Sequence, residues 1–149
     1  MIYDTSYRND LVREEINRRV GKPFTLMKRL QMMGNGSERM KILDASIKFY
    51  PYLNRTPYST WASIELRPKG ILVFFKQRER HFTWIIPYHQ LSLFKSKILS
   101  IYGQGNFLKL EITGRKNSSF LRKLMNEKAK SSYENHPPFQ ENKDRKKVL

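Results

Sequence analysis

The feature that most constrains the fold is a series of short apolar segments between residues 61 and 112, each ended by a turn. Of these 52 residues, 25 are large apolar residues, aromatics or alanine. In Ala62–Leu66 and again in Phe107–Ile112, apolar and polar side chains alternate, which is typical of half-buried strands. The connections are too short to hold crossover helices. The pattern therefore predicts an antiparallel sheet rather than a parallel one.

One segment of this region is apolar on both faces. Ile71–Phe75 contains five consecutive large apolar residues, which predicts a central strand or one covered on each side. It follows Arg67-Pro68-Lys69-Gly70, where proline in second place and glycine in fourth favour a type I turn. Lys76–His81 is then predicted to be a charged turn. Three further strands are expected at Phe82–Ile86, Leu91–Leu93 and Ile98–Tyr102.

Helices are predicted before and after these strands. Asp10–Val20 carries an apolar stripe, with Asn9 or Asp10 as its cap, and Gly21 and Pro23 end it. A second helix is expected over Phe24–Met33, with one apolar face formed by Leu26, Met27, Leu30 and Met33. A last helix is predicted to be capped by Asn117 or Ser118, with its stripe formed by Phe120, Leu121, Leu124 and Met125, continued by Ala129.

Residues 37–50 fit two structures. Met40, Leu43 and Ile47 follow a helical spacing, whereas Ile47 and Phe49 also fit a strand. We divide the chain into an N-terminal helical extension over residues 1–45, a sheet-plus-helix domain over residues 46–134, and a disordered basic tail over residues 135–149.

The charge of the chain favours a polyanionic partner. There are 29 Lys and Arg against 13 Asp and Glu, a formal net charge of +16. The excess is spread evenly: residues 1–60 and 61–114 each carry +5, and residues 115–149 carry +6. Such a surface attracts nucleic acid or anionic lipid. There is no cysteine, which excludes disulfides and fits a cytoplasmic location. No apolar run approaches the ~20 residues of a transmembrane helix, and the polar start predicts no secretory signal.

The sequence is poorly equipped for catalysis. The strand region holds three carboxylates, Glu65, Glu79 and Glu111, and two histidines, His81 and His89. Acid–base chemistry would require members of the two sets to meet in a pocket. No metal-ligand spacing and no phosphate-binding glycine loop is present. We therefore predict a protein that is not an enzyme, with no catalytic residue, no metal and no cofactor.

The order of these segments resembles the bacterial pleckstrin-homology-like (PH-like) domain. The similar stretch of sequence runs from Arg67-Pro68-Lys69-Gly70 through Ile71–Phe75 and a charged turn to Trp84-Ile85-Ile86-Pro87-Tyr88 and Leu91–Phe94. The resemblance covers roughly residues 47–133. It implies an α+β fold: an antiparallel, partly closed PH-like barrel or sheet of about six to seven strands, capped by a C-terminal helix. Part of Ile47–Leu53 would supply the seventh strand, and the N-terminal helices are a departure from the family.

The resemblance also implies a binding module. Lys69, Arg78 and Arg80 match the lysine and basic-x-basic pattern of phosphoinositide-binding members, and with Lys76 they form the predicted site for an anionic group. A protein segment is the leading expected partner, with an anionic lipid surface as a second. The alternative function is sequence-nonspecific nucleic-acid binding. It is suggested by an aromatic and basic stretch, because exposed aromatic residues beside cations can stack on bases. Its members are Tyr50, Tyr52, Arg55, Tyr58 and Trp61. Of these, Tyr50 and Trp61 are expected to be core residues.

Overall fold

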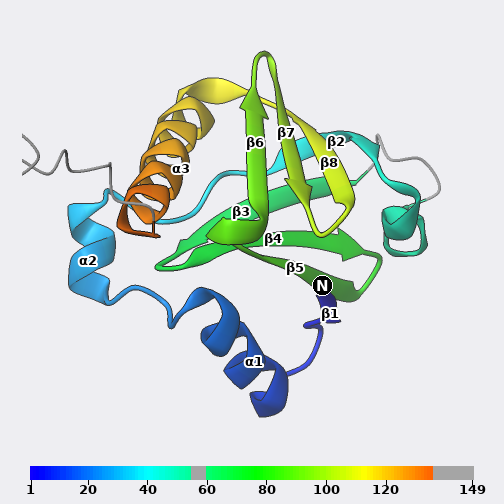
Figure 1. The fold of residues 1–149 in the computed structure, drawn as a ribbon. Coiled ribbons are helices and arrows are strands. Elements are labelled where there is room, and N and C mark those ends of the chain that lie inside the picture. The colour runs from blue at the N-terminus through cyan, green and yellow to red at the C-terminus, as the bar shows by residue number, and fades with distance from the viewer. Residues whose placement is uncertain (55–59, 136–149) are drawn as a thin grey trace, which may run out of the picture.

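The computed structural model describes residues 1–54 and 60–135 as an α+β fold built on one antiparallel sheet of eight strands (Figure 1). The spatial order is β1-β5-β4-β3-β2-β8-β7-β6. The strands are β1 (Ile2–Asp4), β2 (Met40–Ala45), β3 (Trp61–Arg67), β4 (Gly70–Gln77), β5 (Arg80–Pro87), β6 (Leu91–Lys95), β7 (Ile98–Gly103) and β8 (Asn106–Glu111). The helices are α1 (Asp10–Val20), α2 (Leu26–Gln31) and α3 (Gly114–Asn135), and the 3-10 helices are η1 (Ile47–Tyr52) and η3 (Tyr88–Gln90). The predicted fold class is confirmed, and the sheet does not close.

The sheet bends so that its two halves enclose the main core. Strands β3–β5 cross the direction of β6–β8 (Figure 1), and the register of β2 against β8 shifts between Ile42 and Asp44, where the halves meet. A bulge of this kind bends a strand and increases its twist. Phe49 and Trp84 meet edge to face in the centre, with ring centroids 4.8 Å apart. From α3, Phe120, Leu121 and Leu124 pack into the same core, so the C-terminal helix covers it as predicted.

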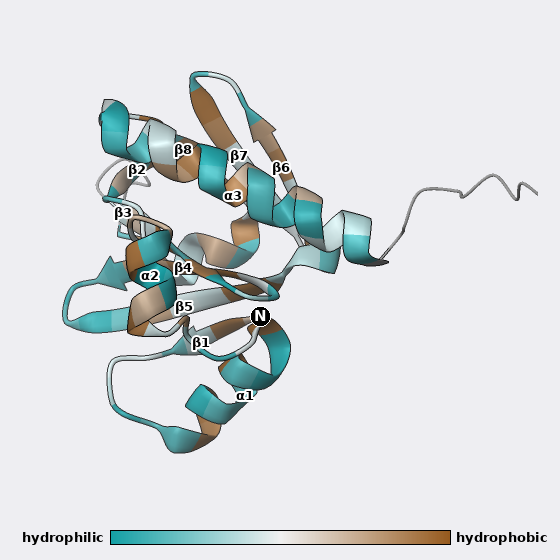
Figure 2. Cartoon of the chain, turned by 90° about the vertical axis from the view of Figure 1, so that its left-hand side faces the viewer, coloured by the Kyte–Doolittle hydropathy of each residue, from teal (hydrophilic) through white to brown (hydrophobic). Residues whose placement is uncertain are grey.

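Helix α1 covers the outer face of the sheet. Ile16 and Val20 pack with Leu72 of β4 and Ile85 of β5 in a second apolar cluster. The double-faced apolar strand predicted from the sequence is thus covered on both sides. Figure 2 shows α1 and α3 on opposite sides of β3–β5. Asn9 caps α1 through Leu11 N and Val12 N, and Glu15 pairs with both Arg18 and Arg19.

Arg67 links α1 to the sheet. Its guanidinium donates to Asn17 Oδ1 at 3.1 Å and to the Gly21 carbonyl at 3.0 Å, and Glu65 lies 3.7 Å from its Nε. The residue is only 8% exposed, and burial lowers the pKa of Arg67. Its hydrogen bonds hold the end of α1 on β3, so this cation serves the fold.

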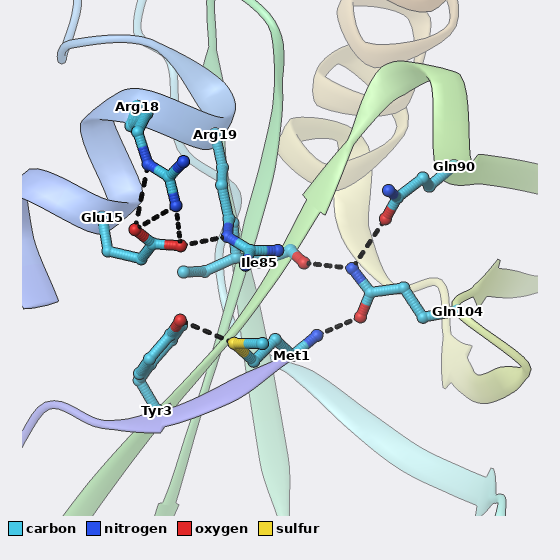
Figure 3. A network of polar contacts seen from close by, with 8 residues as sticks. All are labelled: Met1, Tyr3, Glu15, Arg18, Arg19, Ile85, Gln90 and Gln104. Carbon is cyan, nitrogen blue, oxygen red and sulfur yellow. Dashed lines mark hydrogen bonds and ion pairs between the residues drawn. The ribbon is translucent and has the colours of Figure 1, made fainter.

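The first strand is held by a polar network (Figure 3). β1 pairs with β5, with Ile2 opposite Trp84, and the Met1 ammonium group donates to the Gln104 side chain. Gln104 in turn donates to the Ile85 carbonyl at 3.0 Å and to Gln90 at 2.9 Å. The network therefore connects β1 with β5, η3 and the β7–β8 turn.

Several expectations differ from the structure. Residues 40–45, assigned to the N-terminal extension, form β2 between β3 and β8, whereas Ile47–Leu53 supplies no strand and contains η1. Buried and less buried residues alternate at the start of Met40–Ala45, as a strand requires. This segment forms β2 because it pairs with a strand on each side, β3 and β8. The charged turn is also shorter than residues 76–81, because β4 and β5 extend to Gln77 and Arg80.

The helical expectations need two corrections. The second helix, expected over Phe24–Met33, spans only Leu26–Gln31. Its predicted apolar face is exposed; the residues concerned are Leu26, Met27, Leu30 and Met33. Phe24 and Met32 contact the core instead. Asn117 does not cap α3: it lies inside the helix, buried, and accepts from Glu38 N at 2.9 Å. Except for Asn135, which ends α3, the predicted tail lies outside the described residues.

Candidate functional site: a basic cleft

The predicted site residues lie at two ends of one strand. Lys69 is in the β3–β4 turn, whereas Lys76, Arg78 and Arg80 are at or beside the β4–β5 turn. Lys69 and Lys76 are separated by seven residues of extended chain, or about 23 Å at ~3.3 Å per residue. The structure brings the last three together and leaves Lys69 apart from them.

Arg80 already has partners. Its guanidinium donates to Asp4 Oδ2 at 2.6 Å and lies over the Phe82 ring, 5.2 Å from the centroid. Hydrogen bonds from Ser6 and then from Arg80 lower the pKa of Asp4 to about 2. The charge of Arg80 is therefore engaged in holding β1 beside β5, which leaves Lys76 and Arg78 as the predicted cations still available to a ligand.

Lys76 and Arg78 line an open cleft of about 690 Å³ on the outer face of the sheet. We call it the basic cleft. Its lining residues come from β3, β4, β5 and the β4–β5 turn, from the segments that follow β1 and η1, and from the segment before β2. They are Thr5, Arg39, Asn54, Trp61, Ser63, Phe74, Phe75, Lys76, Arg78, His81 and Phe82. The register of the strands brings several of these residues together: Lys76 of β4 is opposite His81 of β5, and Phe74 of β4 is opposite Ser63 of β3.

In the part of the chain that the structure describes, the cations of the cleft form no ion pair with a carboxylate. None of its lining residues is a carboxylate. Within residues 1–54 and 60–135, no ion pair engages Arg39, Lys76 or Arg78. The nearest acid in sequence to Arg39 is Glu38, which pairs with Lys116 at 3.4 Å. Uncompensated cations around one concave surface produce a positive potential that favours an anionic ligand.

Trp61 is the aromatic side chain most available in the cleft. It is 46% exposed, so the expectation that it belongs to the core is wrong, as is the same expectation for Tyr50. Position explains Trp61: along β3 the alternate residues Ala62, Ile64 and Leu66 face the core, which turns Trp61 to the outer face. Trp61 also lines a second cavity of about 530 Å³ beside the first, together with Arg39 and Ser63.

The groups considered for catalysis are not joined. Glu65 pairs with Arg67, and Glu111 ends β8 on the other half of the sheet. In the part of the chain that the structure describes, no hydrogen bond or ion pair connects Glu65, Glu79 or Glu111 with either histidine of the strand region. Among residues 1–54 and 60–135, no group of three or more His, Asp or Glu side chains is arranged to hold a metal ion.

Arg39 is the functional candidate that the sequence reasoning missed. It lies just before β2, in the segment that fitted either a helix or a strand. The sequence signal that could have found it is the alternation of basic and apolar residues in Arg39-Met40-Lys41-Ile42. In the structure Met40 and Ile42 are buried in the core, which puts Arg39 and Lys41 on the outer face. Of the aromatic and basic stretch, Arg55 and Tyr58 lie outside the described residues.

No family model matches the chain, and comparisons with curated proteins and with solved structures find no match either. In addition, no helix among the described residues is long and apolar enough to cross a membrane.

Proposed function

We propose that this chain is a non-enzymatic interaction module of PH-like type that binds an anionic group in the basic cleft. The single observation that carries the proposal is a set of three cations, Arg39, Lys76 and Arg78, around one concavity: among the described residues they form no ion pair, and no carboxylate lines the concavity. Converging Lys and Arg side chains bind phosphate oxygens through charge-assisted hydrogen bonds.

One further feature supports the PH-like part of the proposal. Strands β2–β5 and β6–β8 form two consecutive antiparallel runs that are joined where β8 pairs with β2, and α3 follows β8 directly and packs into the core. The helix α1, which departs from the family, covers part of the outer face of the sheet through Ile16 and Val20. The protein segment expected from the resemblance stays a prediction, because the charge of the cleft favours an anion over an extended neutral peptide.

Calorimetric titration with inorganic tripolyphosphate at low salt tests the proposal. The cleft variant combines Arg39→Gln, Lys76→Gln and Arg78→Gly. Glycine suits position 78, because Arg78 has a φ of 54° and a residue without a Cβ adopts this region without strain. We expect the cleft variant to bind at least about tenfold more weakly, as the loss of several charge-assisted contacts implies.

A matched control removes three exposed cations outside the cleft through Lys69→Gln, Lys95→Gln and Lys97→Gln. Both variants have the same net charge. If the control loses as much affinity as the cleft variant, binding follows overall charge and the cleft is not the site. Absence of measurable binding by the wild-type protein would also refute the proposal.

A further inference from the structure

We propose that the anion bound in the basic cleft is the backbone of a single-stranded nucleic acid, with one unpaired base stacked on Trp61. This inference rests on the proposed function, since it names the ligand class of the same site. It is carried by an additional feature: an exposed indole stands among the unpaired cations, which a site for phosphate alone does not require.

The position of Trp61 suits a stacking platform. Residues Arg39, Trp61 and Ser63 line both neighbouring cavities, so Trp61 borders open space in each of them. Its cross-strand neighbour on β2 is Lys41. An aromatic residue that is 46% exposed leaves much of its apolar surface in water, and stacking a base there removes that surface from solvent.

The cations share the cleft with Trp61. Arg39 lines both cavities, while Lys76 and Arg78 line the larger one. The second cavity is also lined by Glu38, whose carboxylate pairs with Lys116, so the larger cavity is the one that offers several cations beside Trp61. Sequence-tolerant binding of single strands combines these two elements, a positive groove for the phosphates and an aromatic face for the bases.

Other polyanions use only part of this arrangement. An acidic peptide or a polyphosphate would satisfy the cations but would leave the indole without a planar partner. A duplex offers the same phosphates, but its bases are already paired and stacked on each other. The combination of Trp61 with Arg39, Lys76 and Arg78 thus favours a single strand over a double strand or an acidic protein segment.

The deciding experiment compares two probes of equal charge. A fluorescently labelled oligothymidylate and an abasic oligomer of the same length carry the same phosphodiester backbone, but only the first has bases. By anisotropy at low salt, we expect the oligothymidylate to bind about tenfold more tightly, the order of magnitude that one base–aromatic stack contributes. Emission from Trp61 should be quenched by the oligothymidylate and changed little by the abasic oligomer.

Substitutions then assign the difference to one side chain. Trp61→Ala should bind both probes with the weaker, abasic-like affinity, whereas Trp61→Phe should retain part of the preference for bases. Circular dichroism verifies that each variant is folded, and Trp61→Phe keeps the test decisive if Trp61→Ala fails to fold. The matched control is Phe94→Ala, because Phe94 of β6 is a 65% exposed aromatic residue outside the cleft; it should bind both probes as the wild type does.

Salt dependence tests the phosphate contacts separately. Three neutralised phosphates predict that log K falls against log salt with a slope of about −2, from ~0.7 per single-strand phosphate. The Arg39, Lys76 and Arg78 variant should reduce this slope, whereas Trp61→Phe should leave it unchanged. A slope unaffected by removal of the three cations would overturn their assignment as phosphate contacts.

The remaining outcomes separate the two proposals. Equal affinity for the two oligomers, with binding still lost in the cleft variant, would overturn base stacking and leave the anion site intact. Tighter binding to polyglutamate or to vesicles containing phosphatidylglycerol than to oligothymidylate would overturn the nucleic-acid assignment in favour of that partner. If no polyanion binds, including tripolyphosphate, both proposals fail.

Discussion

Replacement of Leu72 by alanine tests whether α1 is an integral part of the fold. Leu72 lies on β4, is 1% exposed, and packs with Ile16 and Val20 of α1 and with Ile85. Truncation removes most of a buried leucine side chain and leaves a cavity between helix and sheet. Buried Leu→Ala changes cost about 2–5 kcal/mol, and we expect about 3 kcal/mol because α1 can settle partly into the space.

Urea denaturation followed by tryptophan emission measures this loss. Trp84 is fully buried in the main core, so its signal reports global unfolding. The midpoint should fall with little change in the slope m. For a chain of this length, about 3 kcal/mol corresponds to roughly 6–12 °C in Tm.

Two companion variants make the measurement specific. Leu11→Ala changes a leucine on the same helix that is 78% exposed, and it should alter stability by no more than about 0.5 kcal/mol. In a double-mutant cycle, Leu72→Ala and Val20→Ala should show a coupling energy of at least about 0.5 kcal/mol. A Leu72→Ala protein as stable as Leu11→Ala, or additive with Val20→Ala, would mean that α1 does not cover the outer face of β4.

Two predictions concern buried and titrating groups. Tyr88→Phe should cost about 1 kcal/mol, because the Tyr88 hydroxyl donates to the buried Arg67 carbonyl at 3.2 Å. Burial raises the pKa of Tyr88 above its ordinary value of 10.0, so the wild type should lose stability as pH rises above 10 more than Tyr88→Phe does; equal alkaline losses in urea titrations would contradict this. Asp4 has its pKa lowered from 3.8 to about 2 by Ser6 and Arg80, so its stabilising contribution is complete above pH 3.8 and is lost as pH falls through about 2. Asp4→Asn should flatten that part of the acid unfolding curve, and an unchanged curve would show that these contacts do not form.

The local signals in the sequence were sufficient for most strands and for α1. Alternation in Ala62–Leu66 and the turn at residues 67–70 predicted β3 and its connection to β4, because the period of two and the turn preferences act over a few residues. The Asn9 cap and Gly21 set the ends of α1 in the same way. These features depend on neighbours in sequence, so a single chain carries them.

The four cations predicted from the sequence do not share one place. Lys76 and Arg78 line one cleft, whereas Lys69 lies at the far end of β4 and Arg80 is paired with Asp4; that Lys76 and Arg78 bind an anion stays a prediction. Arg39 and the exposure of Trp61 were missed. Both follow from β2 pairing with β3, and that pairing joins segments that residues 46–60 separate in the sequence.

The sequence by itself determined the antiparallel α+β class, the covered strand Ile71–Phe75 and the formal net charge of +16. Tertiary structure alone decided which residues share a surface. The alternation of side chains along a strand specifies its two faces. It does not specify which strand lies beside that strand or what covers each face. The pairing of β2 with β3 and β8, and the packing of α1 on β4 and β5, determined the outcome. Trp61, Arg39 and Lys76 line one cleft, whereas Lys69 and Arg67 are not among its lining residues.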